Sequence, residues 1–150
     1  MLKLASVLAL LLVGTAPLFA DDMPMNAGTI KWGPAPAVLP AGAELAVMAG
    51  DPSKDDAFVL RLKMPAGYKV AAHNHPTSEF VTVLSGNFHI GMGDKLDETK
   101  GTELTAGGFG IAPAGMNHFA WTTSDTIIQV HGDGPFTISY VNPADDPSKK

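Results

Sequence analysis

Cysteine is absent from this chain of 150 residues, and its absence removes three features at once. The protein can have no disulfide bonds, no lipid anchor attached to a thiol, and no thiolate ligand for a metal ion. Its fold must therefore be stabilised by burial of a hydrophobic core, and any metal that assists must be held by nitrogen or oxygen atoms.

Positive charge is also scarce. The sequence contains 10 lysine and arginine residues against 15 aspartate and glutamate residues, which gives a net charge of −5. Such a surface repels the phosphates of nucleic acids and the headgroups of anionic lipids. We therefore expect no nucleic-acid partner, and no membrane association once the N-terminal segment described next has been removed.

Long hydrophobic runs are lacking, apart from one run at the start of the chain, Leu4 to Val13. Lys3 precedes this run, and the small residue Ala20 is followed by two acidic residues. This layout is typical of a cleaved secretory signal peptide, which we predict over residues 1–20. The run is shorter than the roughly 20 residues that span a bilayer, although an uncleaved anchor is the alternative. The expected location is periplasmic or secreted.

A helical pattern of hydrophobic residues is lacking as well, whereas short alternating or β-branched runs separated by turn residues are frequent. In residues 58–64, "FVLRLKM", hydrophobic side chains occupy alternate positions. The pattern predicts an all-β fold, either an antiparallel sandwich or a small barrel. We expect one domain over residues 44–141, an extended proline-rich arm or linker over residues 21–43, and a C-terminal tail over residues 142–150.

The stretch "HNHPTSE", residues 73–79, has a spacing that suits a metal site. On a strand, His73 and His75 would project from the same face, with Cα atoms roughly 6 to 7 Å apart. Pro76 cannot continue a strand ladder, so the chain turns there and Glu79 can return to the same ion from the next strand. Imidazole and carboxylate ligands suit iron, manganese, zinc, nickel or copper.

A fourth ligand is expected from "GGFGIAPAGMNH", residues 107–118. Pro113 and Gly115 predict a turn, and His118 begins the strand that follows it. Considered alone, His118 could equally be a strand-end histidine that is hydrogen-bonded to the backbone.

The glycines around these residues have a spacing that resembles the two sequence motifs of the cupin superfamily. In residues 67–86, Gly is followed by five residues, His, one, His, three, Glu, six and Gly. In residues 107–118, Gly is followed by five residues, Pro, one, Gly, two and His, and 20 residues separate the two patterns. Stretches such as "KWGPAPAVLPAGAELAV" and "YVNPADDP" also resemble small exported bacterial single-domain cupins.

This resemblance implies a double-stranded β-helix, or jelly-roll barrel, that forms a single cupin domain. It also implies that one divalent metal ion is bound by His73, His75, Glu79 and His118. A cupin that keeps these residues and binds no metal is the alternative. Four protein ligands alone would close a tetrahedral site, whereas a five- or six-coordinate ion would keep a position for water, substrate or dioxygen.

Three other polar residues are candidates for the wall of a pocket beside the ion. Gln129 and His131 share one face of a strand, and His131 would supply an acid–base group or a hydrogen bond if that face points inward. Thr122 occupies the position where the second motif often ends in Asn. The alternative for His131 is a strand-end surface residue. His89 is expected to be an ordinary sheet residue, and Arg61 to be solvated or ion-paired.

Three functions are compatible with these features, and the fold does not choose among them. The first is a metalloenzyme that acts on a small molecule by dioxygenase, isomerase or lyase chemistry. The second is a non-catalytic module that binds a metal or a metabolite, and the third is a structural protein whose ion only stabilises the fold. A homodimer is a candidate assembly.

Overall fold

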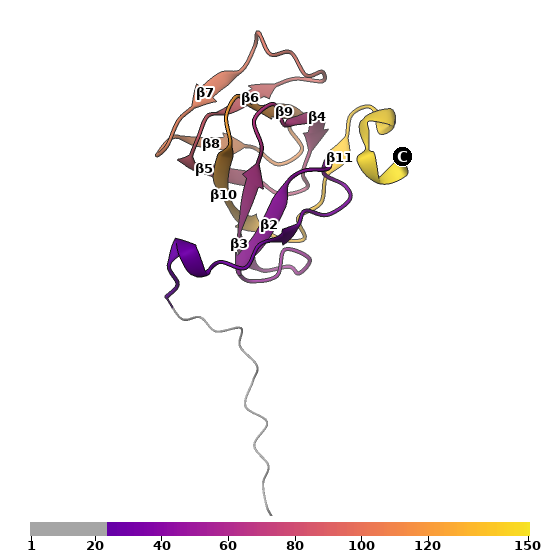
Figure 1. Ribbon diagram of the computed structural model, residues 1–150. Helices are drawn as coiled ribbons and strands as arrows, with labels where there is room; N and C mark the ends of the chain where they lie inside the picture. Colours follow the sequence, from indigo (N-terminus) through magenta and orange to yellow (C-terminus); the bar gives the residue numbers. More distant parts are fainter. Residues whose placement is uncertain (1–23) are drawn as a thin grey trace, which may run out of the picture.

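The computed structural model describes residues 24–150, and most of its regular structure is β-strand (Figure 1). The predicted signal peptide, residues 1–20, lies outside the described residues. None of the helices in the described part is long enough to cross a membrane. The strands and the three 3-10 helices are η1 (Ala27–Thr29), β1 (Gly33–Pro34), β2 (Glu44–Ala49), β3 (Ala57–Met64), β4 (Lys69–Asn74), β5 (Glu79–Ser85), β6 (Phe88–Met92), β7 (Thr102–Leu104), β8 (Phe109–Ala112), β9 (His118–Thr122), β10 (Thr126–Asp133), β11 (Ser139–Tyr140), η2 (Pro143–Asp145) and η3 (Pro147–Lys149).

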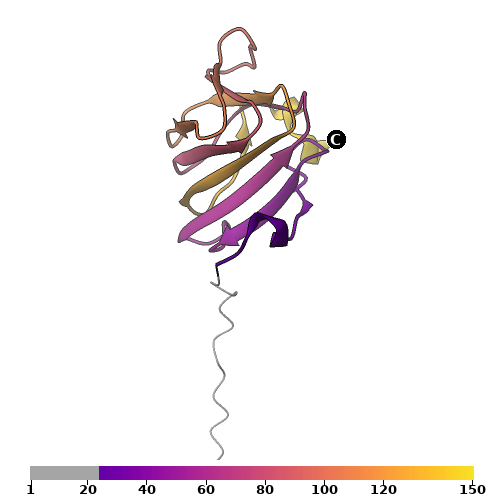
Figure 2. The ribbon, with the colours of Figure 1, turned by 60° about the vertical axis from the view of Figure 1, so that its left-hand side comes forward.

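The strands form two sheets in which every pairing is antiparallel. The first sheet has the strand order β1-β2-β3-β10-β5-β8, and the second has the order β11-β4-β9-β6-β7. Strands β3 and β10 lie side by side although they are far apart in the sequence (Figure 2). The chain thus alternates between two facing sheets, which confirms the predicted all-β jelly-roll barrel.

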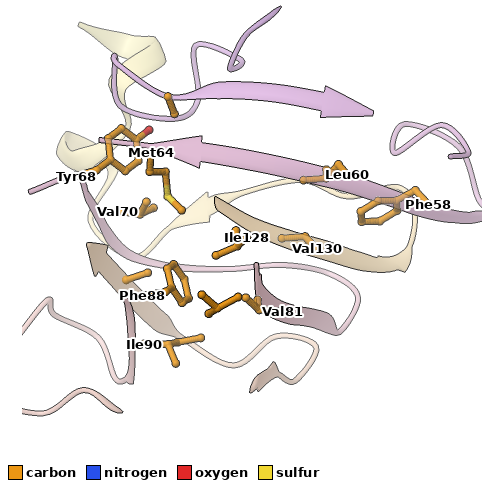
Figure 3. Close-up of a cluster of buried hydrophobic side chains, with 13 residues drawn as sticks. Phe58, Leu60, Met64, Tyr68, Val70, Val81, Phe88, Ile90, Ile128 and Val130 are labelled. Atoms are coloured by element: carbon orange, nitrogen blue, oxygen red, sulfur yellow. The ribbon is translucent and has the colours of Figure 1, made fainter. Parts of the chain in front are cut away.

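The core lies between the two sheets and follows the alternation of hydrophobic residues along each strand. In β3, Phe58, Leu60 and Met64 are buried, as the pattern of residues 58–64 predicts. Figure 3 shows these side chains facing others that come from strands of both sheets. The buried members of this cluster are Ala43, Phe58, Leu60, Met64, Tyr68, Val70, Val81, Val83, Phe88, Ile90, Ala120, Ile128 and Val130.

A smaller cluster lies on the other side of the second sheet, under the loop between β6 and β7. Ala72, Phe119 and Trp121 form this cluster, and Leu96 of the loop packs against it. The loop lies so close that a side chain at Gly101 would collide with the Trp121 ring. Strands β4 and β9 therefore have hydrophobic residues on both faces.

The N-terminal arm, residues 21–43, packs against the barrel over its described part and does not behave as a free linker. Strand β1 pairs with β2, and the backbone N–H of Ala35 donates to the carbonyl of Ala43. The hydroxyl of Tyr68 donates to the carbonyl of Pro40 at 2.5 Å, and the hydroxyl of Tyr140 donates to the carbonyl of Val38 at 2.8 Å. These two bonds fasten the arm across the side of the barrel.

Candidate metal centre

His73 faces the barrel interior because strand β4 contains a β-bulge. Between Val70 and His73, β4 has one more residue than the facing segment of β9. Residues three apart on a regular strand face opposite sides, yet Val70 and His73 both line the interior cavity. Ala72, between them, packs on the outside with Phe119. The bulge therefore turns the histidine pair inward.

His118 is placed opposite His73 by a tight turn and by strand pairing. The N–H of Met116 donates to the carbonyl of Pro113, and Gly115 has a φ of 71° at the third position of this turn. A side chain disfavours that conformation, which explains the glycine. The N–H of Gly115 also donates to the carbonyl of His75, so the turn connects the two histidine-bearing segments. His118 then begins β9 and pairs with His73.

The other two predicted ligands come from the connection between the two sheets. His75 lies just beyond the end of β4, where its ring stacks on Phe136 with centroids 4.3 Å apart. Glu79 is the first residue of β5, which belongs to the first sheet. The cluster therefore joins both sheets at one end of the barrel.

Each of the three buried histidines is fixed by the backbone at the same ring nitrogen. A carbonyl can only accept, so the Nδ1 atom of each histidine must carry the proton that it donates. The Nε2 atom of a neutral ring then has a free lone pair. Backbone carbonyls that orient metal-bound histidines in this way are common in metalloproteins. The bonds run from His73 to Ala71 at 2.7 Å, from His75 to Thr137 at 2.7 Å, and from His118 to Met116 at 3.0 Å.

The unbonded sides of these rings converge with one carboxylate. A ring nitrogen of His73, of His75 and of His118 all lie within 4.8 Å of one another. The Oε2 atom of Glu79 is 3.3 Å from Nε2 of His118 and 3.6 Å from Nε2 of His75. These two Nε2 atoms are buried and have no well-formed hydrogen bond. A buried polar atom without a partner is rare, and a divalent cation would satisfy both atoms together with the carboxylate.

The pKa values of His73 and Glu79 favour the protonation states that metal ligation requires. Burial lowers the pKa of His73 to about 4, so its imidazole is neutral at neutral pH. Burial alone would raise the pKa of Glu79, but contacts with His118 and His75 outweigh it and hold that pKa well below its usual range. Burial lowers the pKa of His118, but the hydrogen bond and the negative charge of Glu79 outweigh burial, so the pKa of His118 is raised.

The cluster lies in the wall of a cavity of about 540 Å³ that occupies the barrel interior. Apart from the four candidate ligands, the lining consists of apolar residues and Thr137. The cavity is not fully enclosed, and Val47 of β2, which is 49% exposed, lies in its lining. The lining residues are Pro36, Val38, Leu39, Leu45, Val47, Pro52, Leu60, Leu62, Met64, Val70, His73, His75, Glu79, Phe88, Ile90, His118, Ala120, Ile128, Phe136, Thr137 and Ile138.

The structure does not place Gln129, His131 or Thr122 in this lining. The inward face of β10 carries Ile128 and Val130, so Gln129 and His131 lie on the outer face of the first sheet. There Gln129 accepts a hydrogen bond from Arg61 at 3.0 Å, and His131 stacks on Phe80.

Thr122 does point inward, but it lies at the far end of β9 from His118. Its hydroxyl donates to the carbonyl of Pro65 and accepts from the N–H of Tyr68, so it closes the opposite end of the barrel.

The arm contributes three residues to the cavity lining that the sequence pattern did not predict, Pro36, Val38 and Leu39. The prolines and alanines around them predict an extended arm or linker and give no indication of a cavity wall. The hydrophobic pair Val38 and Leu39 within that context was the available signal.

Comparison with protein families gives one match over most of the chain. A family model described as Domain of unknown function (DUF4437) matches residues 17–139. No curated protein matches the sequence.

Several solved structures have a similar fold. One is a protein described as a candidate acetylacetone dioxygenase from Methylibium petroleiphilum, with a TM-score of 0.63, 19% identity, and coverage of 97% of this chain and 90% of that one. The polyketide cyclase RemF from Streptomyces resistomycificus has a TM-score of 0.63 and 14% identity, with coverage of 85% and 90%. An RmlC-like cupin from Shewanella frigidimarina has a TM-score of 0.57 and 15% identity, with coverage of 74% and 90%. At these identities the likeness shows the fold alone.

Proposed function

The chain belongs to the DUF4437 family, a cupin-like family, and we propose that it binds one divalent metal ion and acts on a small molecule. The cupin fold, which the two motifs predicted, is confirmed by the jelly-roll topology that the chain shares with solved cupins. The metal, the reaction and the site of action are parts of the proposal.

The observation that supports metal binding is the arrangement of the three buried imidazoles. Each is fixed through Nδ1 by a backbone carbonyl, and two of the Nε2 atoms facing Glu79 have no hydrogen-bond partner. We assign His73, His75, His118 and Glu79 as the ligands. This donor set suits iron, manganese, zinc, nickel or copper.

The position of the cluster supports a role beyond stabilisation of the fold. A purely structural ion needs no space beside it, whereas here all four candidate ligands border a cavity that is not fully enclosed. A bound ion would supply Lewis-acid chemistry or a coordination position for an oxygen-containing substrate. The residues of this chain would orient that substrate and exclude water from it.

The reaction class that we propose is dioxygenase-, isomerase- or lyase-type chemistry. Similar structures include proteins described as a candidate dioxygenase and a polyketide cyclase, which supports catalysis only by analogy. The alternative is a non-catalytic module that binds a metal or a metabolite in the same cavity. Both alternatives use the same ligands and differ in whether a product is formed.

Azide binding tests whether the ion is accessible to small molecules. The iron, copper or nickel form of the protein is titrated with azide while its visible spectrum is recorded. We expect the spectrum to change, because the ion should keep an exchangeable position facing the cavity. His89→Ala is the matched control and should respond like the wild type. An unchanged spectrum at saturating azide would identify a structural site, and oxygen uptake or product formation then separates an enzyme from a binder.

The periplasmic or secreted location and the oligomeric state are also proposals. Export depends on the signal-like segment of residues 1–20, and N-terminal sequencing of the protein from a periplasmic fraction should begin at Asp21. A homodimer would use exposed hydrophobic residues on the outer face of β5 and β8, and light scattering measures it. These residues are Leu84, Phe109 and Ile111.

A further inference from the structure

We propose that the cavity takes a molecule with a single oxygen-bearing head group and an apolar body. The head group lies at the ion, and the barrel wall together with the N-terminal arm encloses the body. This inference names a ligand class for the proposed function and rests on it, because the head group requires the metal.

The composition of the cavity wall carries the first part of the inference. Among its described lining residues there is no lysine or arginine, and Thr137 is the one polar residue besides the four candidate ligands. A second charge on the ligand would therefore be buried without a partner, and several hydroxyl groups would lose their hydrogen bonds to water. Phosphorylated compounds, dicarboxylates and sugars are disfavoured, whereas an aliphatic or aromatic body matches the wall.

The charge of the cluster limits the head group. A divalent ion held by three imidazoles, which must be neutral to bind a metal, and by the single carboxylate of Glu79 leaves a net charge of one positive unit. A neutral or singly negative head group completes this site without leaving an uncompensated charge in the cavity.

The arm supplies the part of the wall that encloses the body of the ligand. Leu39 lines the cavity and packs against the core cluster. The residues on either side of it, Val38 and Pro40, are the two whose carbonyls accept hydrogen bonds from Tyr140 and Tyr68. These are the two tyrosines of the chain, and they come from β11 and from the turn before β4. Leu39 is thus held in place from both sides, which makes it a specificity-determining residue for the ligand body.

Alkyl hydroxamates test the two parts of the ligand separately, because the hydroxamate head chelates the metal and the tail can be varied. The cobalt(II) form is titrated with acetohydroxamate and octanohydroxamate, and binding is followed by visible absorption and by calorimetry. Each buried methylene should strengthen binding by about fourfold, so octanohydroxamate should bind at least on the order of 100-fold more tightly. A hydroxamate of equal length that ends in a carboxylate should lose this gain.

Two variants locate the tail. Leu39→Ala should weaken the binding of octanohydroxamate by about tenfold, because it removes roughly three carbon atoms that would contact the tail. The binding of acetohydroxamate, which has no tail, should be unchanged. Ala120→Leu, which fills the cavity two residues beyond His118, should have the same selective effect. Leu84→Ala truncates a leucine outside the cavity and should leave both affinities unchanged. Circular dichroism confirms that each variant is folded.

The outcomes separate this inference from the proposed function. If the wild type takes up no cobalt, both are overturned. If cobalt and acetohydroxamate bind but the tail gives no gain, or the carboxylate-ended probe binds equally well, only the ligand class is overturned. A gain that Leu39→Ala and Leu84→Ala leave equally intact would remove the arm from the binding site.

Discussion

The five histidines of this chain divide into two regions of the barrel, and the division shows what makes a histidine a candidate ligand. His73, His75 and His118 lie inside one end of the barrel, where backbone carbonyls fix their Nδ1 atoms. His89 and His131 lie on the outer faces of the sheets. Each outer histidine is stacked flat on an aromatic ring, with centroids 4.7 Å apart for His89 on Trp121 and 5.0 Å apart for His131 on Phe80.

The outer region also contains a histidine–carboxylate pair, but its surroundings differ. Nε2 of His89 is 3.5 Å from Oε2 of Glu103, whose side chain is 50% exposed. The same Nε2 atom is 3.3 Å from the hydroxyl oxygen of Thr123. Water can complete the hydrogen bonding of such a pair, so nothing there demands a cation. The inner cluster has its nitrogen atoms buried and convergent, and it is this combination that predicts a metal site.

Removal of an inner histidine should have the largest effect on metal affinity. His118→Ala or His75→Ala should weaken binding by more than about 100-fold, since loss of a residue that merely orients a ligand already costs about 10- to 100-fold. His89→Ala and His131→Ala should bind like the wild type. Competition with a chromophoric chelator measures all four affinities, and circular dichroism verifies the fold.

The reverse pattern, in which His89→Ala loses the metal and His118→Ala keeps it, would show that the outer region is the binding site.

Acid should release the metal from the inner cluster. The histidines must be neutral to bind, so protons compete with the ion around and below the free imidazole pKa of about 6.5, and tight binding moves release to lower pH. Elemental analysis after dialysis across a pH series measures the release. Metal content that stays constant to about pH 3, with the fold intact, would rule out ligation by three histidines.

Chelation should lower the melting temperature of the wild type. An ion that binds only the folded chain stabilises it by about 2.7 kcal/mol at a free concentration 100 times its Kd. For a domain of this size that corresponds to a shift on the order of 10 °C. Differential scanning calorimetry with and without chelator measures the shift, and His118→Ala should show almost none. Equal curves for the wild type would count against the site.

The last expected effect is a slope of stability against pH in the metal-free protein. The pKa of His73 is lowered by burial to about 4, so between about pH 6.5 and pH 4 the unfolded chain binds a proton there that the folded chain does not. Stability from this residue is therefore present above pH 6.5 and is lost as pH falls, by up to about 1.4 kcal/mol per pH unit.

Urea unfolding across this pH range measures the slope. His73→Gln should lose less stability on acidification than the wild type, whereas His89→Gln should keep the wild-type slope. An equal slope in all three proteins would mean that His73 is not buried as described.

Much of the fold could be predicted from the sequence, because alternating hydrophobic residues and turn glycines act through their immediate neighbours. The alternation in residues 58–64 identifies β3, and its inward residues are buried. The glycines of the two motifs occupy positive-φ positions, among them Gly86, where a side chain would also collide with the backbone at Asp125. Such turns depend on one residue type each, so a sequence records them directly.

The site could be predicted only in part, because the register of a strand in its sheet decides which of its faces points into the barrel. The spacing of His73 and His75 indicates that they share a face, but the bulge after Val70 decides which face, and no residue type encodes it. The same dependence on register explains why Gln129 and His131 do not line the cavity as the sequence suggested. Their shared face was predictable, and its outward direction follows from burial of Ile128 and Val130 against the opposite sheet.

Anomalous X-ray diffraction from crystals grown with cobalt or zinc is the most direct test of the proposed centre. Data collected on both sides of the metal absorption edge locate the ion independently of any assumption about its ligands. We expect one strong peak per chain, about 2.0 to 2.2 Å from Nε2 of His73, His75 and His118 and from a carboxylate oxygen of Glu79. A strong peak between His89 and Glu103, or no peak inside the barrel at saturating metal, would contradict the account.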